Sequence, residues 1–371
     1  MTPAMIPALQ SQGQIHAEVN GCLGLITLNR PEALNALSLA MIRDITVLLQ
    51  AWQDAPEIQA VMLLAAARPG KAPVFCAGGD IRFFHVAALN GDAGLDDFFT
   101  EEYALNHLIH HYPKPYIALM DGLVIGGGMG ISQGARLRVL TERSRLAMPE
   151  THIGLFPDVG GGFFLGQCPG HVGQWLALTG EPIAATEAIE YGLGDVFIQS
   201  AALPALIENL RHGEQASAEH VIASVMEHAD LAPASSLPPQ ALINQHFGQP
   251  DVAAIIASLA AADDPWSARM LAKLLQRSPL MMAVTLEQLR RARAMTLAED
   301  LRMERDMVHQ CFHLRPLPEN ETVEGIRALV IDKDHAPRWK PSAIEAVTPA
   351  MVQAYFDSPW TPAQHPLRGL K

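Results

Sequence analysis

Apolar positions near the N-terminus predict a hairpin that leads into a helix. Two stretches rich in apolar and β-branched residues, 15–19 and 23–29, flank the dipeptide Asn20-Gly21, which accepts the positive φ of a tight turn. Beyond Ser38, which can cap a helix through its side chain, apolar residues recur every three or four positions. We therefore expect two paired strands followed by one amphipathic helix.

Strand-like and helix-like patterns alternate through the next part of the chain. Continuous apolar runs predict strands at 61–66, 116–120 and 136–140, and helical spacing predicts helices at 98–111 and 126–133. A chain that alternates strands with helices forms a layered α/β core with parallel strands. The fold class expected for this part of the protein is therefore α/β.

Only helical patterns follow residue 201. Turn signals at 233–239, 264–265 and 278–279 separate stretches whose leucines recur at helical spacing, which is typical of packing faces rather than of a cofactor site. This change marks a boundary, and the closing prolines and glycine indicate a loosely held tail. The predicted segments are a flexible N-terminus at 1–13, a core at 14–200, a helical region at 201–357 and a tail at 358–371.

Charge and composition exclude several classes of protein. Of 371 residues, 26 are Lys or Arg and 39 are Asp or Glu, and the net charge of −13 disfavours nucleic acid and anionic membranes as partners. The four cysteines lie far apart, without the spacing of a zinc site or a disulfide framework, and indicate a reducing compartment. The sequence also lacks a signal-peptide pattern and a membrane span of roughly 18 apolar residues. These observations predict a cytoplasmic protein.

Two glycine-rich segments each follow a strand-like stretch, at 72–75 and 116–120. The first precedes an apolar segment at 81–86, and the second opens the helix predicted at 126–133. The first is 76–80, Cys-Ala-Gly-Gly-Asp, and the second is 122–130, which contains three successive glycines. Glycines at such a junction let backbone N–H groups approach a ligand oxygen, and two such donors suit an oxyanion hole. Neither segment has the spacing of a phosphate loop or of a dinucleotide fingerprint. An ordinary tight turn is the alternative for the first segment.

A third segment, 147–162, carries two acidic residues among apolar neighbours. Glu150 and Asp158 lie eight positions apart, and burial would raise their pKa values towards a range useful for acid–base catalysis. The alternative is a Glu that caps a helix and an Asp that closes a turn. The histidines of 107–111 have helical offsets, but the HExxH pattern is absent and no metal site is predicted.

The three segments, in this order and spacing, resemble the crotonase superfamily of acyl-CoA enzymes. The stretch 28–37, Leu-Asn-Arg-Pro-Glu-Ala-Leu-Asn-Ala-Leu, is also similar to that family's first strand-to-helix signature, and the match covers about residues 14–200. Further motifs resemble the branch that hydrolyses 3-hydroxyacyl-CoA thioesters and extend the likeness to nearly the full chain. They lie at 101–103, 147–151, 154–162 and 325–341.

The resemblance implies a fold and an activity. The fold is the crotonase fold of repeated ββα units, with a helical C-terminal region that covers the active site. The activity is hydrolysis of a branched 3-hydroxyacyl-CoA, 3-hydroxyisobutyryl-CoA, in valine breakdown. The partner is then a small acyl-CoA substrate, no separate cofactor is needed because coenzyme A is part of the substrate, and a homo-oligomer is compatible with the family.

The resemblance also assigns roles to individual residues. Backbone N–H groups of Gly79 and Gly127 match the oxyanion-hole donors, and Glu150 matches the catalytic glutamate. Other matches concern the acyl pocket and coenzyme A. Asp158 serves the chemistry as a holder of the substrate 3-hydroxyl or as a group that tunes Glu150, Glu102 lines the acyl pocket, Gly78 and Gly126 flank the donors, and Arg30 is a candidate cation for coenzyme A.

One position departs from the better-known hydratases of the superfamily. Their second catalytic glutamate corresponds here to Gly130, and a hydratase needs two carboxylates to hold one water. This departure favours the hydrolase over an enoyl-CoA hydratase or isomerase. A non-catalytic acyl-CoA-binding protein is a further alternative, and the sequence leaves open whether Glu150 activates water or attacks the thioester itself.

Overall fold

A computed structural model describes residues 6–212, 217–235 and 240–371. The chain forms two compact units, and each unit draws on three separate segments. The first, here called the sheet unit, comprises Met1–Gly79, Ala104–Leu146 and Ile183–Ser235. The second, the helical unit, comprises Asp80–Tyr103, Ala147–Pro182 and Ser236–Lys371.

Part of two sequence predictions lies outside the described residues. These are positions 1–5 of the flexible N-terminus and positions 236–239 of the proline-containing turn. The predicted segments 14–200 and 201–357 are consecutive, whereas both compact units are discontinuous along the chain. Within the described ranges, no helix has the length and apolar character needed to cross a bilayer.

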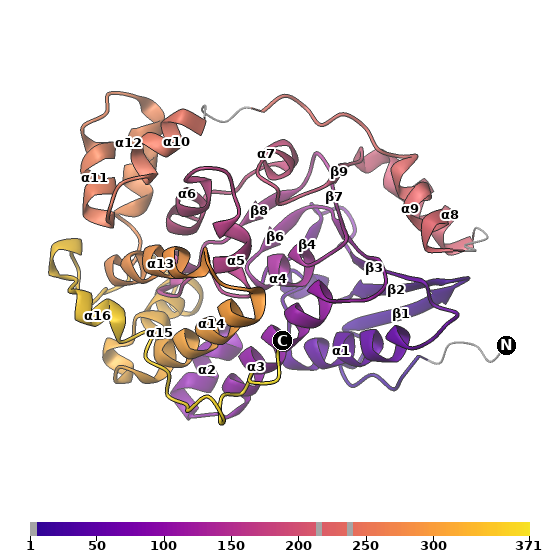
Figure 1. Ribbon diagram of the computed structural model, residues 1–371, viewed down its shortest axis with the longest axis horizontal. Coiled ribbons are helices and arrows are strands. Elements are labelled where there is room, and N and C mark those ends of the chain that lie inside the picture. Colours follow the sequence, from indigo (N-terminus) through magenta and orange to yellow (C-terminus); the bar gives the residue numbers. More distant parts are fainter. Residues whose placement is uncertain (1–5, 213–216, 236–239) are drawn as a thin grey trace. The chain divides into compact units, whose positions relative to one another are not determined.

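The sheet unit is built on a six-stranded sheet (Figure 1). Its first two strands form the antiparallel hairpin that the Asn20-Gly21 turn predicts, and the remaining neighbours pair in parallel, as expected for an α/β core. In spatial order the strands are β1 (Ile15–Asn20), β2 (Leu23–Leu28), β3 (Ala60–Ala65), β5 (Tyr116–Met120), β7 (Leu137–Leu140) and β9 (Val196–Phe197).

A second sheet of three short strands gives the fold its repeat. Along the chain, β3, β5 and β7 of the large sheet are each followed by one strand of the small sheet and then by a helical element. This order is the repeated ββα unit, and it confirms the predicted fold class. The small sheet comprises β4 (Val74–Cys76), β6 (Leu123–Ile125) and β8 (Arg145–Ala147), and the helical elements are α2 (Ile81–Asn90), α4 (Gly127–Gln133) and the 3₁₀ turn Glu150–Ile153.

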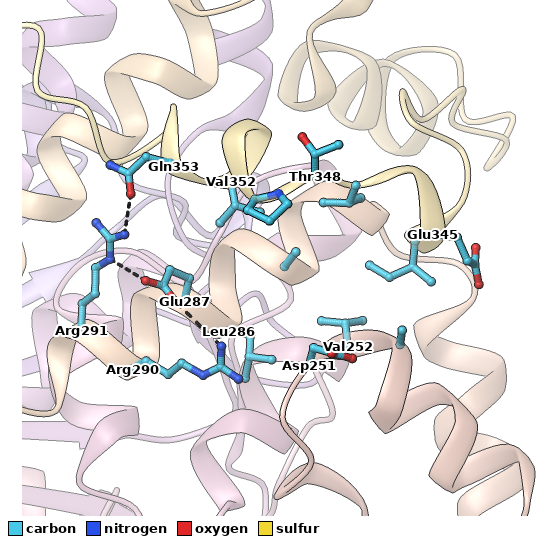
Figure 2. Close-up of a pocket in the computed structure, with 15 residues that line it drawn as sticks. Asp251, Val252, Leu286, Glu287, Arg290, Arg291, Glu345, Thr348, Val352 and Gln353 are labelled. Atoms are coloured by element: carbon cyan, nitrogen blue, oxygen red, sulfur yellow. Dashed lines mark hydrogen bonds and ion pairs between the residues drawn. The ribbon is translucent and has the colours of Figure 1, made fainter.

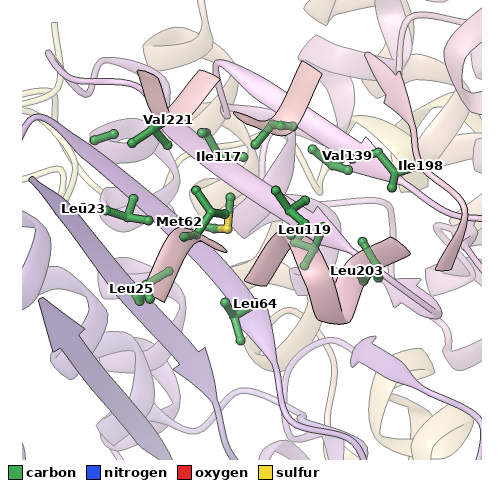
Figure 3. Close-up of a cluster of buried hydrophobic side chains, with 14 of the residues drawn as sticks. Leu23, Leu25, Met62, Leu64, Ile117, Leu119, Val139, Ile198, Leu203 and Val221 are labelled. Carbon is green, nitrogen blue, oxygen red and sulfur yellow. The ribbon is translucent and has the colours of Figure 1, made fainter. Parts of the chain in front are cut away.

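Helices cover both faces of the large sheet. On one face, Val221 of α9 (Ala218–Met226) packs in one apolar cluster with Met62 and Leu119 (Figure 3). Leu206 of α8 (Leu203–His212) belongs to the same cluster. Successive strand residues point to opposite faces, so Gly24 points away from this cluster. A Cβ at Gly24 would lie 2.6 Å from the Trp52 ring of α1 (Leu39–Gln53), which packs on the other face.

Truncation of Leu206 tests the contribution of this cluster. Leu206 is fully buried, so Leu206→Ala should lower the free energy of unfolding by about 2–5 kcal/mol through lost burial and a residual cavity. Leu231 in the same unit is 89% exposed, and Leu231→Ala should change stability by less than about 0.5 kcal/mol. Urea unfolding followed by circular dichroism measures both, and similar losses in the two variants would contradict the assignment of this core.

Helices make up the helical unit, and no strand follows β9 among the described residues, as the sequence predicts.

Side-chain caps begin several of these helices. Thr296 and Glu299, for example, form a capping box at the start of α14 (Leu297–His313). The predicted loose tail contains buried His365 and Leu367. The main helices are α5 (Gly161–Gly166), α6 (Val172–Thr179), α10 (Gln240–Phe247), α11 (Val252–Ala260), α12 (Pro265–Leu274), α13 (Pro279–Ala292), α14 (Leu297–His313), α15 (Glu321–Ile326) and α16 (Pro349–Gln353), and α3 (Gly94–His110) spans the division between the units.

Candidate active site

Two glycine turns lie side by side in the sheet unit. They follow β4 and β6 of the small sheet, which pair in parallel, so both turns leave the same edge of that sheet. Gly78 has a φ of 95°, and a Cβ added there would lie 3.2 Å from the carbonyl oxygen of Ile125 and 3.5 Å from the nitrogen of Gly127. The structure therefore brings the predicted pairs Gly78-Gly79 and Gly126-Gly127 together, and the close approach requires glycine.

The amides of Gly79 and Gly127 are the two candidate donors of these turns. Gly127 is the first residue of α4, so its N–H has no acceptor within the helix. Neither N–H donates a hydrogen bond to another residue in the described part of the chain. Two unpaired donors on adjacent, sterically fixed turns are suited to bind one oxyanion.

The segment that carries Arg30 contacts the first of these turns. The N–H of Leu37 donates to the carbonyl oxygen of Gly78 at 2.8 Å, and the Arg30 guanidinium donates to the carbonyl oxygen of Ala36 at 3.1 Å. Arg30 thus helps to close the loop that adjoins the glycine turn. Its predicted contact with coenzyme A stays a prediction.

The predicted carboxylates lie together in the helical unit. Glu102 on α3, Glu150 at the start of the 3₁₀ turn and Asp158 are all buried, although carboxylates rarely are. The hydroxyl of Tyr103 donates to Asp158 Oδ2 at 2.8 Å. Within the described residues, Glu102 Oε1 and Glu150 Oε2 have no hydrogen-bond partner. Such partnerless oxygens are costly to bury, so these side chains serve more than the capping and turn roles of the alternative interpretation.

Glu102, Glu150 and Asp158 form a cluster of buried carboxyl groups. Burial and the repulsion between their charges raise the pKa values of this cluster. Burial raises the pKa of Glu150 well above its usual range, and the nearby charge of Asp158 raises it further. The pKa of Glu102 is raised by burial and then by the charges of Asp158 and Glu150. Burial also raises the pKa of Asp158, to about 6, although the Tyr103 hydrogen bond opposes the change. At neutral pH the cluster can therefore both hold and accept protons.

Glu102→Gln should make the folded protein less sensitive to alkaline pH. A carboxyl whose pKa is raised in the folded state stabilises that state fully below its unfolded pKa, near 4.5, and the contribution is lost as pH rises through the folded value. The loss amounts to about 1.4 kcal/mol for each pH unit between the two values. We expect the variant to melt above the wild type at pH 8 and to differ less at pH 5. Calorimetry across this range checks the result, and an equal offset at both pH values would contradict it.

Sequence reasoning missed two further buried carboxylates of the helical unit. Asp300 and Glu304 lie on α14 and are fully buried, and their oxygens accept hydrogen bonds from the backbone that follows Asp158. The sequence does contain a pattern that indicates burial of Glu304. Glu304 falls between Leu301 and Val308, at positions where helical spacing predicts apolar residues.

A surface pocket of about 590 Å³ in the helical unit does not contain the predicted site residues (Figure 2). It lies among α11, α13, α16 and the segment 344–348. Two of its charged side chains bind each other, since Arg291 donates to Glu287 at 2.8 Å, and Arg291 also donates to Gln353 at 2.9 Å. In the part of the chain that the structure describes, none of the lining carboxylates is a buried one without a partner, unlike Glu102 and Glu150.

One group of described residues has the spacing of metal ligands. Ligand atoms of Asp96, His309 and His313 lie within 4.8 Å of one another. Arg305 donates to Asp96 Oδ1 at 2.5 Å, and the two imidazole rings stack with their centroids 4.2 Å apart. Burial would raise the pKa of Asp96, but hydrogen bonds from both histidines and the charge of Arg305 outweigh it and lower the pKa. Asp96 is thus satisfied as an ionised partner of Arg305.

Comparison with known proteins identifies the family to which this chain belongs. A family model described as enoyl-CoA hydratase/isomerase matches residues 23–356. This chain belongs to that family, the crotonase superfamily that the sequence motifs resemble. A crystal structure of a carnitinyl-CoA dehydratase from Mycobacterium thermoresistibile is 36% identical, with a TM-score of 0.86, and covers 94% of this chain and 98% of its own. An enoyl-CoA hydratase structure from Rhodobacter sphaeroides 2.4.1 is 37% identical, with a TM-score of 0.84 and the same coverage.

Curated relatives narrow the class to one branch. A 3-hydroxyisobutyryl-CoA hydrolase, mitochondrial, from Xenopus tropicalis is 40% identical over 344 residues, which are 91% of this chain and 87% of the relative. The Homo sapiens protein of the same name is 38% identical over 352 residues, which are 93% of this chain and 89% of the relative. The predicted resemblance to the superfamily and to this branch is confirmed.

Proposed function

We propose that this protein hydrolyses 3-hydroxyisobutyryl-CoA to 3-hydroxyisobutyrate and coenzyme A, a step of valine breakdown. The observation that carries the proposal is the buried Glu150, whose Oε2 has no partner among the described residues and is available to a water or a substrate. Relatives about 40% identical over nine-tenths of the chain carry the name of this hydrolase.

The mechanism follows from where charge develops. Attack on the thioester carbonyl places negative charge on its oxygen, which hydrogen bonds from the N–H groups of Gly79 and Gly127 would stabilise; losing one such donor typically costs about 10²–10³ in rate. Glu150 takes the proton of the attacking water, the carbon–sulfur bond breaks, and the coenzyme A thiolate leaves and is protonated.

The substrate hydroxyl gives the remaining carboxylates a role. Tyr103 occupies Oδ2 of Asp158, which leaves Oδ1 as an acceptor, and Glu102 Oε1 is partnerless. A hydroxyl at the third carbon of the acyl chain can donate to either carboxylate, whereas an unsubstituted acyl group would leave Glu102 Oε1 buried and unpaired. We therefore assign specificity for 3-hydroxyacyl groups to Asp158 and Glu102.

Direct attack by Glu150 is the alternative route within the same reaction. It would form an anhydride with the acyl group, which water then hydrolyses. Single-turnover hydrolysis in ¹⁸O water distinguishes the two routes. Label in the Glu150 carboxylate supports the anhydride, and label confined to the product acid supports the general base.

Hydration of an enoyl-CoA is the second candidate function, because two similar solved structures are described as a dehydratase and a hydratase. Gly130 argues against it, since it replaces the second carboxylate that syn addition of water requires. A panel of 3-hydroxyisobutyryl-CoA, 3-hydroxypropionyl-CoA, crotonyl-CoA and acetyl-CoA, followed by thiol release and by enoyl absorbance, separates the candidates. Thiol release that prefers the hydroxyacyl substrates supports the hydrolase. Loss of enoyl absorbance without thiol release would make the protein a hydratase, and binding without either reaction would make it a non-catalytic acyl-CoA binder.

Three further expectations stay predictions. They concern the contact of Arg30 with coenzyme A, a cytoplasmic location and assembly into a homo-oligomer. Sedimentation at micromolar concentration would determine the oligomeric state.

A further inference from the structure

One buried carboxylate, that of Glu304, binds the backbone at two positions after Asp158. Glu304 Oε2 accepts from the N–H of Gly160 at 2.7 Å, and its Oε1 accepts from the N–H of Gly162 at 3.0 Å. Both glycines lie within the four residues after Asp158, whereas Glu304 lies more than 140 positions further along the chain. One side chain therefore fixes two successive points of this turn.

Gln288 extends the same contact to the residue before Asp158. Its Nε2 donates to the carbonyl oxygen of Pro157 at 2.7 Å and to Glu304 Oε1 at 3.0 Å. Pro157 and Gly160 enclose Asp158, so the backbone is held on either side of it. Gln288 and Glu304, which we call the backbone clamp, are both fully buried.

The clamped turn has a conformation that it would not hold by itself. Val159 has a φ of 57°, a left-handed value that is a genuine outlier for a β-branched residue. Gly160 follows with a φ of 85°. Backbone strain of this kind persists only where the surroundings impose it. Here the hydrogen bonds of Glu304 supply that constraint.

The next helix start is fixed in the same way. Asp300 Oδ2 accepts from the N–H of Phe163 at 2.8 Å, so α14 binds three N–H groups at the start of α5. A side chain at Gly162 could not be accommodated, because its Cβ would lie 2.4 Å from Asp300 Oδ1. A side chain at Gly162 would therefore disturb the contact between this turn and α14.

We propose that Glu304, together with Gln288, is a positioning residue that orients Asp158 for the substrate hydroxyl. The clamp sets the backbone of residues 157–162, and Tyr103 sets the carboxylate of Asp158 at its other end. This inference rests on the proposed function, in which Asp158 binds the 3-hydroxyl. Glu304 itself does not touch the substrate; it acts through Asp158.

A double-mutant cycle with Asp158 tests the proposal. Glu304→Ala should lower kcat/KM for 3-hydroxyisobutyryl-CoA by about 10²-fold, since displacement of a positioned group costs rate in this range. In an Asp158→Asn background the same change should cause little further loss, because the group that Glu304 orients is already absent. Glu304→Gln, which keeps one acceptor and the side-chain volume, should retain part of the activity.

The matched control is Asp44. It is also a buried carboxylate that accepts two backbone N–H groups, those of Gln10 at 2.8 Å and Ser11 at 2.9 Å, but it belongs to the sheet unit. Asp44→Asn should lower the melting temperature and leave kcat/KM unchanged at temperatures where the protein is folded. If Glu304→Ala does not fold, Gln288→Ala removes the contact with Pro157 and replaces it in the cycle.

Hydrogen exchange supplies a readout that does not require activity. The amides of Gly160 and Gly162 should exchange faster in Glu304→Ala or Glu304→Gln than in the wild type, and at the wild-type rate in Asp44→Asn. Unchanged exchange, or equal kinetic losses from Glu304→Ala with and without Asp158, would overturn the positioning role. Absence of thiol release by the wild type would instead overturn the proposed function, and the exchange result would still decide whether the clamp exists.

Discussion

Replacement of Glu150 by glutamine is expected to lower kcat/KM for 3-hydroxyisobutyryl-CoA by about 10²–10⁴-fold, the usual contribution of a positioned general base. The variant keeps the volume of a fully packed side chain, so the loss should come from chemistry and the melting temperature at pH 7 should not fall. Removing a buried carboxyl with a raised pKa should even stabilise the fold at that pH. Thiol release and calorimetry on the same preparation measure both effects.

Glu187 provides the control for this substitution. It is a buried glutamate of the sheet unit, where it accepts from the N–H of Ala184 at 3.2 Å and from the hydroxyl of Ser235 at 2.9 Å. Glu187→Gln should leave kcat/KM unchanged. If Glu150→Gln retained most of the wild-type activity, Glu150 could be neither the base nor the nucleophile, and the mechanism would be wrong.

In a plot of kcat/KM against pH, activity should be lost on the acidic side, and the midpoint of this acidic limb should lie well above the ordinary pKa of a glutamate. The reaction needs ionised Glu150, so activity rises as pH passes through the pKa of that group. Burial is the main cause of its raised pKa and the charge of Asp158 is the second. Asp158→Asn removes the second cause, so the limb should move to lower pH while remaining above the ordinary value.

A matched substitution makes this shift interpretable. Tyr103→Phe removes the hydrogen bond that lowers the pKa of Asp158 but leaves the Asp158 carboxylate in place. Because Asp158 can still ionise in this variant, the limb should move to lower pH by less than in Asp158→Asn. A limb near pH 4.5, or an unchanged limb in Asp158→Asn, would contradict the assignment of Glu150 as the titrating group.

Local patterns predicted the long elements and one short strand, Val74–Cys76, but missed the other short strands. The strand Tyr116–Met120 appears as predicted, because five successive apolar residues leave little ambiguity. The strands Leu123–Ile125 and Arg145–Ala147 have three residues each, too few to show a period. They are nevertheless essential to the site, because β6 delivers Gly126 and Gly127.

Burial of Glu150 and Asp158 could be predicted because their apolar neighbours are adjacent in sequence. The hydrogen bond between Tyr103 and Asp158 could not, since it joins residues 55 positions apart. The same holds for Glu304, whose contact with Gly160 depends on how α14 packs. An acidic residue on an apolar helical stripe was the available signal, and it indicates burial without identifying the partner.

The distance along the chain between Glu304 and Gly160 also sets an order of events during synthesis. The two residues are 144 positions apart, so at ordinary translation rates of 5–20 residues per second the ribosome needs roughly 7–30 s to pass from one to the other. Until then the turn after Asp158 has been made but lacks the side chain that constrains it. A truncated or nascent chain that ends before α14 should therefore be catalytically incompetent even when every residue that touches the thioester is already present.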